Sequence, residues 1–278
     1  MPSTSKILTS LLISKQIREI IEKGERIDGR DLQNFRNITI RPGEVKKADG
    51  SAYVALGDTT VVAGVKFELG TPFPDTPNKG IIIVEGEMLP FASLEAEPGP
   101  PTPKEVELSR VVDRGVRESG MVDLEKFVIE PGQKVIKMFI DFSILNDAGN
   151  LIDASSLAAA ASLLCADYPN PQELIEDPSA TVENVSKIPL EVKDLPTSVT
   201  FADLFGHLVV DPTAEEEIAM RSQLTITHMK NDKICAIQKS GSGDLPFEKV
   251  FEAEEVARAK SKALRDIVIG AVEGREIA

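Results

Sequence analysis

Three arginines in the segment ELSRVVDRGVRES are spaced so that one helix face could hold them against the phosphates of a nucleic acid. Arg110, Arg114 and Arg117 stand at i, i+4 and i+7, and residues at this spacing share one side of an α-helix. Apolar residues fill the positions between them, which predicts a helix over about 104–118 with a buried side away from the arginines. Guanidinium groups bind phosphate through paired hydrogen bonds, so this face is a candidate phosphate contact.

The same arginines also fit an ordinary solvated surface. Glu107, Asp113 and Glu118 lie in the same segment, at spacings that allow i,i+3 and i,i+4 ion pairs. Spacing alone favours this second interpretation. The arginines therefore indicate a nucleic-acid contact only if another feature of the chain supports one.

A second candidate is the turn that joins a strand-like run, KVIKMFIDFSI, to the Ala-rich helix of LNDAGNLIDASSLAAAASLLC. A glycine-containing turn at this place can present free backbone N–H groups at the positive end of the helix dipole, which suits a phosphate. The turn contains no Lys or Arg, however, and its nearest charges are Asp147 and Asp153. The residues alone leave three interpretations open: a working anion site, a lost one, or plain packing.

The acidic run in LVVDPTAEEEIAMRSQ has the composition of a metal or acid–base cluster. It also matches the start of a helix, with Asp211 as N-cap, Pro212 at the first helical position and the glutamates 215–217 in the first turn. We favour the helix start. The Gly/Ser stretch KSGSGDLPF lacks the lysine pattern of a nucleotide-binding loop and is predicted to be a connector.

The cysteines and histidines give no sign of a metal or redox centre. Cys165 lies in the Ala-rich helix and Cys235 in the strand-like run KICAIQK, and both are predicted to be buried, reduced thiols. His207 and His228 are far apart in the chain, whereas a structural zinc site needs about four clustered ligands. The chain also lacks GxSxG, CxxC and a complete GxxxxGK[ST], so neither a cofactor nor a metal is expected.

Composition limits the class of protein. The 278 residues are 42% hydrophobic but only 5% aromatic, which predicts a sizeable aliphatic core. The 45 Asp and Glu outnumber the 31 Lys and Arg, which gives a net charge of −14. This balance argues against a chain that holds nucleic acid by itself, but it allows a local basic patch or a partner that supplies the charge.

No apolar run approaches the ~18 residues of a membrane span. The N-terminal segment lacks the features of a signal peptide, so we expect a cytoplasmic protein without membrane contact.

Strands and helices are mixed in both halves of the chain, which predicts an α/β (α+β) fold. A β-hairpin is expected around Gly57-Asp58, and a rigid Pro-rich surface loop over 90–104. The predicted units are an N-terminal helix over 1–28, a first core domain over 29–168, a polar Pro-rich linker over 169–195, and a second domain over 196–278 that ends in a long helix from about Pro246. The N-terminal helix is amphipathic, with six apolar residues available for packing: Leu8, Leu11, Leu12, Ile17, Ile20 and Ile21.

The chain resembles the RNase PH family and, within it, the non-catalytic ring subunits of the archaeal exosome. The resemblance is carried by ERIDGRDLQNFRNITI, KADGSAYVALGDTTVVAGVK, DTPNKG, the EPGPP loop, ELSRVVDRGVRES, VIEPG, LVVDPTAEEE and IQKSGSG. These segments run from about Glu25 to Gly243 and so cover most of the chain. RIDGR and VVDRG in this order are specific, whereas the Gly-rich pieces alone would not be. The resemblance implies an RNase PH-like fold with mixed sheets and packed helices.

The resemblance also implies that this chain has lost its own active site. Catalytic members hold phosphate with a turn of the form G-[ST]-R at the start of a helix, and that pattern falls here on Gly149, Asn150 and Leu151. They also carry an Asp shortly after the acidic run, at a position that holds Arg221 here. The turn has thus lost its cation and the second position has the opposite charge. No catalytic residue is therefore expected in this chain.

A non-catalytic member of such a ring has partners. The resemblance implies a hetero-hexamer, a trimer of dimers, in which this chain alternates with a catalytic RNase PH-like subunit around a channel for single-stranded RNA. It also implies RNA-binding cap proteins. Arg110 and Arg114 are then expected to contact the RNA backbone beside the partner's site, and Arg117 is a further candidate.

Two other functions stay open. The chain could itself be an active phosphorolytic exoribonuclease with a different phosphate site, although Leu151 and Arg221 speak against this. It could also be a pure scaffold whose arginine face makes only salt bridges and never touches RNA.

Overall fold

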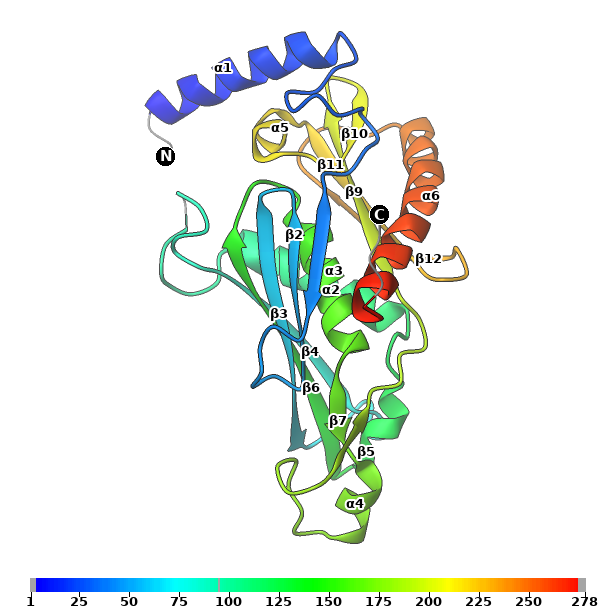
Figure 1. Ribbon diagram of the computed structural model, residues 1–278. Coiled ribbons are helices and arrows are strands. Elements are labelled where there is room, and N and C mark those ends of the chain that lie inside the picture. Colours follow the sequence, from blue (N-terminus) through cyan, green and yellow to red (C-terminus); the bar gives the residue numbers. More distant parts are fainter. Residues whose placement is uncertain (1–3, 95, 275–278) are drawn as a thin grey trace.

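A long six-stranded sheet and a shorter four-stranded sheet lie at either side of two central helices, α2 and α3 (Figure 1). This computed structural model describes residues 4–94 and 96–274. In chain order the elements are α1 (Thr4–Ile21), β1 (Ile38–Pro42), β2 (Gly50–Leu56), β3 (Thr59–Gly70), β4 (Ile81–Met88), α2 (Pro103–Glu118), η1 (Leu124–Phe127), β5 (Val128–Glu130), β6 (Lys134–Asn146), α3 (Leu151–Leu164), β7 (Asp167–Pro169), α4 (Pro171–Glu176), β8 (Lys187–Pro189), β9 (Thr197–Leu204), β10 (His207–Val210), α5 (Ala214–Ala219), β11 (Ser222–His228), β12 (Ile234–Ser240) and α6 (Phe247–Val272).

The first sheet has the strand order β1-β2-β3-β6-β4, and β5 pairs with β6 beside this path. All pairs are antiparallel except β4 with β6, which is parallel. The β2–β3 connection confirms the predicted hairpin, and Gly57 has φ +57° at its turn. Burial alternates along β3, with Val61, Ala63 and Val65 buried and their neighbours less so. One face of the sheet therefore packs against the helices while the other meets solvent.

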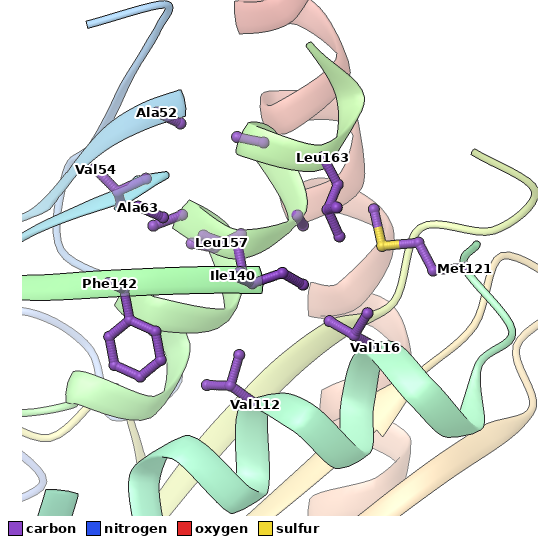
Figure 2. Close-up of a cluster of buried hydrophobic side chains, with 14 of the residues drawn as sticks. Ala52, Val54, Ala63, Val112, Val116, Met121, Ile140, Phe142, Leu157 and Leu163 are labelled. Carbon is purple, nitrogen blue, oxygen red and sulfur yellow. The ribbon is translucent and has the colours of Figure 1, made fainter. Parts of the chain in front are cut away.

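Helix α3 lies at the centre of the molecule and is buried almost all round. Its Ala, Ser and Leu side chains are small enough for both sheets to approach it, since α3 contacts β2 and β3 on one side and β9 on the other. Gly50 permits the closest approach, because a Cβ there would lie only 2.4 Å from the carbonyl oxygen of Ser162. Figure 2 shows Leu157 and Leu163 of α3 among Ala52, Val54 and Ala63 of the first sheet and Ile140 of β6.

Helix α2 begins one residue before the predicted start, because Thr102 caps it. The Thr102 side chain accepts from the backbone N–H of Glu105, the Glu105 carboxylate accepts from Thr102, and Pro103 occupies the first turn. Val112 and Val116 point from α2 into the core (Figure 2). This packing turns the arginine side of the helix outward, as predicted.

The second sheet has the order β10-β9-β11-β12 and is antiparallel throughout. Strand β9 is buried along its whole length because α3 covers one face and α6 the other. The stretch KSGSGDLPF connects β12 to α6, and the long C-terminal helix is confirmed, with Pro246 as its N-cap residue. An α+β architecture with mixed sheets and packed helices is therefore confirmed.

The N-terminal helix is confirmed, and its second half is packed against the second sheet. Ile17 and Ile21 are buried in a small core with Ala202, Leu204 and Val209 of the second sheet. The first half of α1 extends beyond α5 (Figure 1), and Leu8, Leu11 and Leu12 are 59%, 63% and 62% exposed.

Residues 169–195, predicted to be a linker, contain helix α4 and strand β8, which pairs with β7. The division into two domains at this segment stays a prediction. Of the predicted units, residues 1–3 and 275–278 lie outside the described residues. Within residues 4–94 and 96–274, no helix has both the length and the hydrophobicity that a bilayer crossing requires.

Candidate nucleic-acid interface

The outward side of α2 opens onto a cleft of about 520 Å³, called here the arginine cleft. The Pro-rich loop, helix α2 and strand β12 form its walls. Its lining residues are Pro101, Pro103, Val106, Glu107, Arg110, Val111, Arg114 and Gln238. Two of the three predicted arginines, Arg110 and Arg114, thus come together in one hollow of the surface.

Arg110 and Arg114 form no ion pair with any residue that the structure describes. Across residues 4–94 and 96–274, no carboxylate lies within ion-pair distance of either guanidinium. Arg110 is exposed, and Arg114, which is half-buried, donates from Nη1 to the neutral Oε1 of Gln238 at 3.0 Å. The surface interpretation allowed these arginines to pair with the neighbouring acids, and the described structure shows no such pairs for these two.

Arg117 behaves differently from its neighbours. Its Nη2 and Nε donate to the two carboxylate oxygens of Asp113 at 2.6 and 3.1 Å, and Nη2 also donates to the carbonyl of Ile82 at 3.1 Å. The hydrogen bond to Asp113 raises the pKa of Arg117 above its usual value. Arg117 is therefore neutralised on its own helix and does not line the arginine cleft, so the structure separates it from Arg110 and Arg114.

The turn Gly149–Leu151 joins β6 to α3 with two residues of positive φ. Gly149 has φ +92°, and a Cβ there would lie 2.4 Å from the backbone of Thr213, so only glycine fits. Asn150 has φ +54° and is the N-cap of α3. Leu151 is buried in the hydrophobic core.

The anion at this turn is a carboxylate of the chain itself. The backbone N–H of Asn150 donates to Oε1 of Glu217, which comes from α5, at 2.8 Å. Burial raises the pKa of Glu217, although the nearby Lys104 and the N–H of Asn150 oppose that shift. The positive end of α3 therefore already has a negative partner within the fold.

Asp211 is not the N-cap that the sequence predicts. Thr213 caps α5, and its side chain and that of Glu216 form a capping box. Asp211 is fully buried, has φ +53° and accepts hydrogen bonds from two arginines: Arg30 Nη1 lies 2.9 Å from Oδ2, and Arg36 Nη2 lies 2.7 Å from Oδ1. Two partly buried guanidinium groups thus occupy the Asp211 carboxylate, whose oxygens do not cap the helix.

These arginines tie the turn to the rest of the fold. Arg36 also donates to the carbonyls of Ala148 and Gly149, at 2.9 and 3.0 Å. Arg26 donates through Nε to Glu216 at 2.9 Å, with both side chains fully buried. Asp211 and Glu216 of the acidic run are thus committed to internal ion pairs. The sequence shows Arg26, Arg30 and Arg36 only within the RIDGR and NFRN segments, and it does not indicate which acids they pair with.

Arg221 stands outside this network. It is exposed just before β11, and its carbonyl accepts from the backbone N–H of Gly243 at 2.8 Å, beside the Gly/Ser connector. Among the described residues, no hydrogen bond or ion pair joins the Arg221 side chain to the turn.

The thiols are less buried than predicted. Cys165 and Cys235 are both partly exposed, because Cys165 lies just past the end of α3 and Cys235 on the edge strand β12. Burial still raises the pKa of Cys235 to about 11, so its thiol stays protonated at neutral pH. Both cysteines are free, as predicted.

Comparison with known proteins points to one family. The model of the 3′ exoribonuclease family, domain 1, matches residues 34–169, and that of domain 2 matches residues 194–260. An exosome complex component Rrp42 of Thermococcus onnurineus is 41% identical over 97% of this chain and 98% of the relative. The corresponding protein of Pyrococcus furiosus is 45% identical over 92% of each chain.

Solved structures agree with this. A chain of the Archaeoglobus fulgidus exosome with RNA bound to the active site superimposes with a TM-score of 0.86 at 42% identity, over 93% of this chain and 98% of that one. A chain of an archaeal exosome core gives a TM-score of 0.83 at 39% identity, over 95% of this chain and 99% of that one.

Proposed function

The chain belongs to the 3′ exoribonuclease family of RNase PH-like proteins, and from this premise we propose that it is a non-catalytic subunit of an exosome ring. The similar chains named Rrp42 and the similar chains of archaeal exosome structures support its place in an exosome. In this proposal the ring degrades RNA from the 3′ end with phosphate, while this chain shapes the partner's active site and holds the RNA.

The turn Gly149–Leu151 supports the proposal that this chain has no active site of its own. Phosphorolysis brings inorganic phosphate against an RNA diester, so two anionic groups must approach each other and a fixed cation is needed between them. Leu151 offers no such cation and is buried in the core. The N–H of Asn150, which a phosphate would need, is bonded to Glu217.

The observation that carries the RNA contact is the pair of unpaired guanidinium groups in the arginine cleft. A chain of net charge −14 has enough carboxylates to neutralise every exposed arginine, yet Arg110 and Arg114 have no ion pair with the described residues. Phosphate recognition by Arg requires such free N–H groups. Arg117, paired with Asp113, is not part of this proposal.

We further propose a hetero-hexamer, a trimer of dimers, with a catalytic RNase PH-like subunit as partner and RNA-binding cap proteins on the ring. Leu8, Leu11 and Leu12 on the first half of α1 support a partner surface, because three neighbouring leucines more than half exposed favour burial against another chain. A cytoplasmic location stays part of the proposal.

The experiment is a phosphate-dependent RNA decay assay on the purified chain, on the catalytic partner, and on their mixture. We expect no nucleoside diphosphates from the chain alone, and robust 3′-to-5′ decay from the mixture, which should elute as a ring of about six chains by light scattering, as the family resemblance implies. Nucleoside diphosphates from the chain alone, above a contamination control, would mean that it has a phosphate site of its own.

A further inference from the structure

A chain of hydrogen bonds crosses from helix α2 to strand β12 at the wall of the arginine cleft. Nη1 of Arg114 donates to Oε1 of Gln238 at 3.0 Å, and Nε2 of Gln238 donates to Oε1 of Glu107 at 3.2 Å. Glu107 and Arg114 are both on α2, whereas Gln238 lies in the second sheet, 124 residues from Arg114. One amide thus joins two oppositely charged side chains of the helix.

Glu107 fixes which way the amide points. A guanidinium group has only donors, so a reversed Gln238 would bring its NH₂ group against the N–H groups of Arg114. An ionised carboxylate has only acceptors, so the same reversal would set the amide oxygen against Glu107. Both neighbours therefore favour the orientation in which the amide oxygen faces Arg114.

Gln238 differs from the partner of Arg117 in charge. Asp113 accepts from two N–H groups of Arg117 and cancels its charge. Gln238 is neutral, and it accepts from Nη1 of Arg114 while the other N–H groups of that guanidinium have no partner among the described residues. Arg114 is held in place, yet its positive charge is left for a ligand.

We propose that Gln238 is a positioning residue for RNA binding, which holds Arg114 ready for a backbone phosphate of single-stranded RNA without neutralising it. This inference rests on the proposed function, in which Arg110 and Arg114 contact that RNA. A long side chain that is ordered before binding loses less conformational entropy when the phosphate arrives. The second sheet thereby contributes to a contact that sequence reasoning assigns to α2 alone.

The test is a double-mutant cycle on the assembled ring, with a labelled single-stranded RNA in phosphate-free buffer so that the RNA is bound but not degraded. Gln238→Met keeps the length of the side chain and removes both hydrogen bonds. We expect it to weaken RNA binding roughly two- to tenfold, the range of a single hydrogen bond. In a ring that already carries Arg114→Ala, the same change should have no effect, because Gln238 acts through Arg114.

A second variant separates position from charge. Gln238→Glu still offers an acceptor to Arg114 but adds a negative charge, so the dependence of log affinity on log salt should flatten by roughly 0.7, the contribution of one phosphate contact on a single strand. Gln223→Met is the matched control. Gln223 lies on the neighbouring strand β11, and its Oε1 accepts from Ser240 rather than from α2. It should leave RNA binding unchanged.

Three results would overturn the inference. The first is that Gln238→Met leaves RNA binding unchanged. The second is that Gln238→Met weakens RNA binding equally in rings with Arg114 and in rings with Arg114→Ala. The third is that Gln223→Met weakens RNA binding as much as Gln238→Met does. If Arg110→Ala with Arg114→Ala leaves binding unchanged, the proposed RNA contact itself fails. If that pair weakens binding and Gln238→Met does not, only the role of Gln238 fails.

Discussion

Replacing Arg110 and Arg114 together by alanine tests the RNA contact most directly, and the structure sets the size of the effect. Both side chains line the arginine cleft and lack ion-pair partners among the described residues, so each can neutralise one RNA phosphate. Each neutralised phosphate on a single strand contributes roughly 0.7 to the slope of log affinity against log salt. The double variant should therefore flatten that slope by roughly 1.4 per RNA bound.

The assay measures RNA affinity of the assembled ring by fluorescence anisotropy in phosphate-free buffer between about 50 and 200 mM salt. Over this fourfold range, a slope change of roughly 1.4 corresponds to a roughly sevenfold difference in how much affinity the two rings lose. The loss should be similar for RNAs of different sequence, because phosphate contacts carry no sequence information. Decay in the presence of phosphate should also slow, since a loosely held 3′ end is positioned less often for attack.

Arg117→Ala is the matched control on the same helix. Asp113 already neutralises Arg117, so its removal should leave the salt slope nearly unchanged. The ring should form in every case, because Val112 and Val116, on the other side of α2, make the core contacts. An assembled double variant with the slope and decay rate of the original ring would refute the reasoning, and the scaffold interpretation would then be the better one.

Two further predictions concern the fold. Gly115→Ala should stabilise the chain by about 0.5–1 kcal/mol in urea unfolding, because alanine is the better helix former and its Cβ would meet Thr227 at an ordinary 3.6 Å; a lower unfolding midpoint would show that the helix cannot accept the methyl group. Burial raises the pKa of Asp153 to about 7, so between pH 4 and 7 the folded chain keeps a proton that the unfolded chain has released, and stability falls as pH rises. Asp153→Asn should remove up to about 1.4 kcal/mol per pH unit of that downward slope, and an unchanged slope would mean that Asp153 does not titrate in this window.

The elements that the sequence predicts well are those that local rules determine. The hairpin at Gly57, the apolar side of α2 and the Ala-rich α3 follow from turn chemistry and from periodicity. Helix α4 was missed inside the Pro-rich segment 169–195, although Pro171 occupies the first turn of a helix that Asn170 caps. A proline breaks a helix when it lies in the helix interior, but it is favoured at the first helical position. The prediction of a linker counted the prolines of the segment and did not consider where each one would lie in a helix.

Local sequence rules do not determine which ion pairs form in the folded chain. Arg114 and Arg117 both have an acid four residues away, Glu118 and Asp113, and local rules favour the second pair only slightly because there the acid precedes the base. In the structure only Arg117 pairs with its acid, while Arg114 turns to Gln238 of β12. Similarly, Asp211 has the sequence context of an N-cap, but Arg30 and Arg36, which lie more than 170 residues earlier, take its oxygens. Such choices depend on which elements the fold brings together.

The turn at Gly149–Leu151 shows what a substitution pattern alone leaves out. From the sequence, the site has lost its cation at Leu151 and has the opposite charge at Arg221, but the backbone of the turn is expected to be kept. In the structure, Leu151 belongs to the hydrophobic core, and the backbone N–H of Asn150 is bonded to Glu217. A cation restored at 151 would have to leave the core, and a phosphate would have to displace the Glu217 carboxylate from the backbone N–H of Asn150. The start of α3 thus anchors α5 through Asn150 and Glu217, and this contact, together with the buried Leu151, supports the proposal that the chain has no phosphate site of its own.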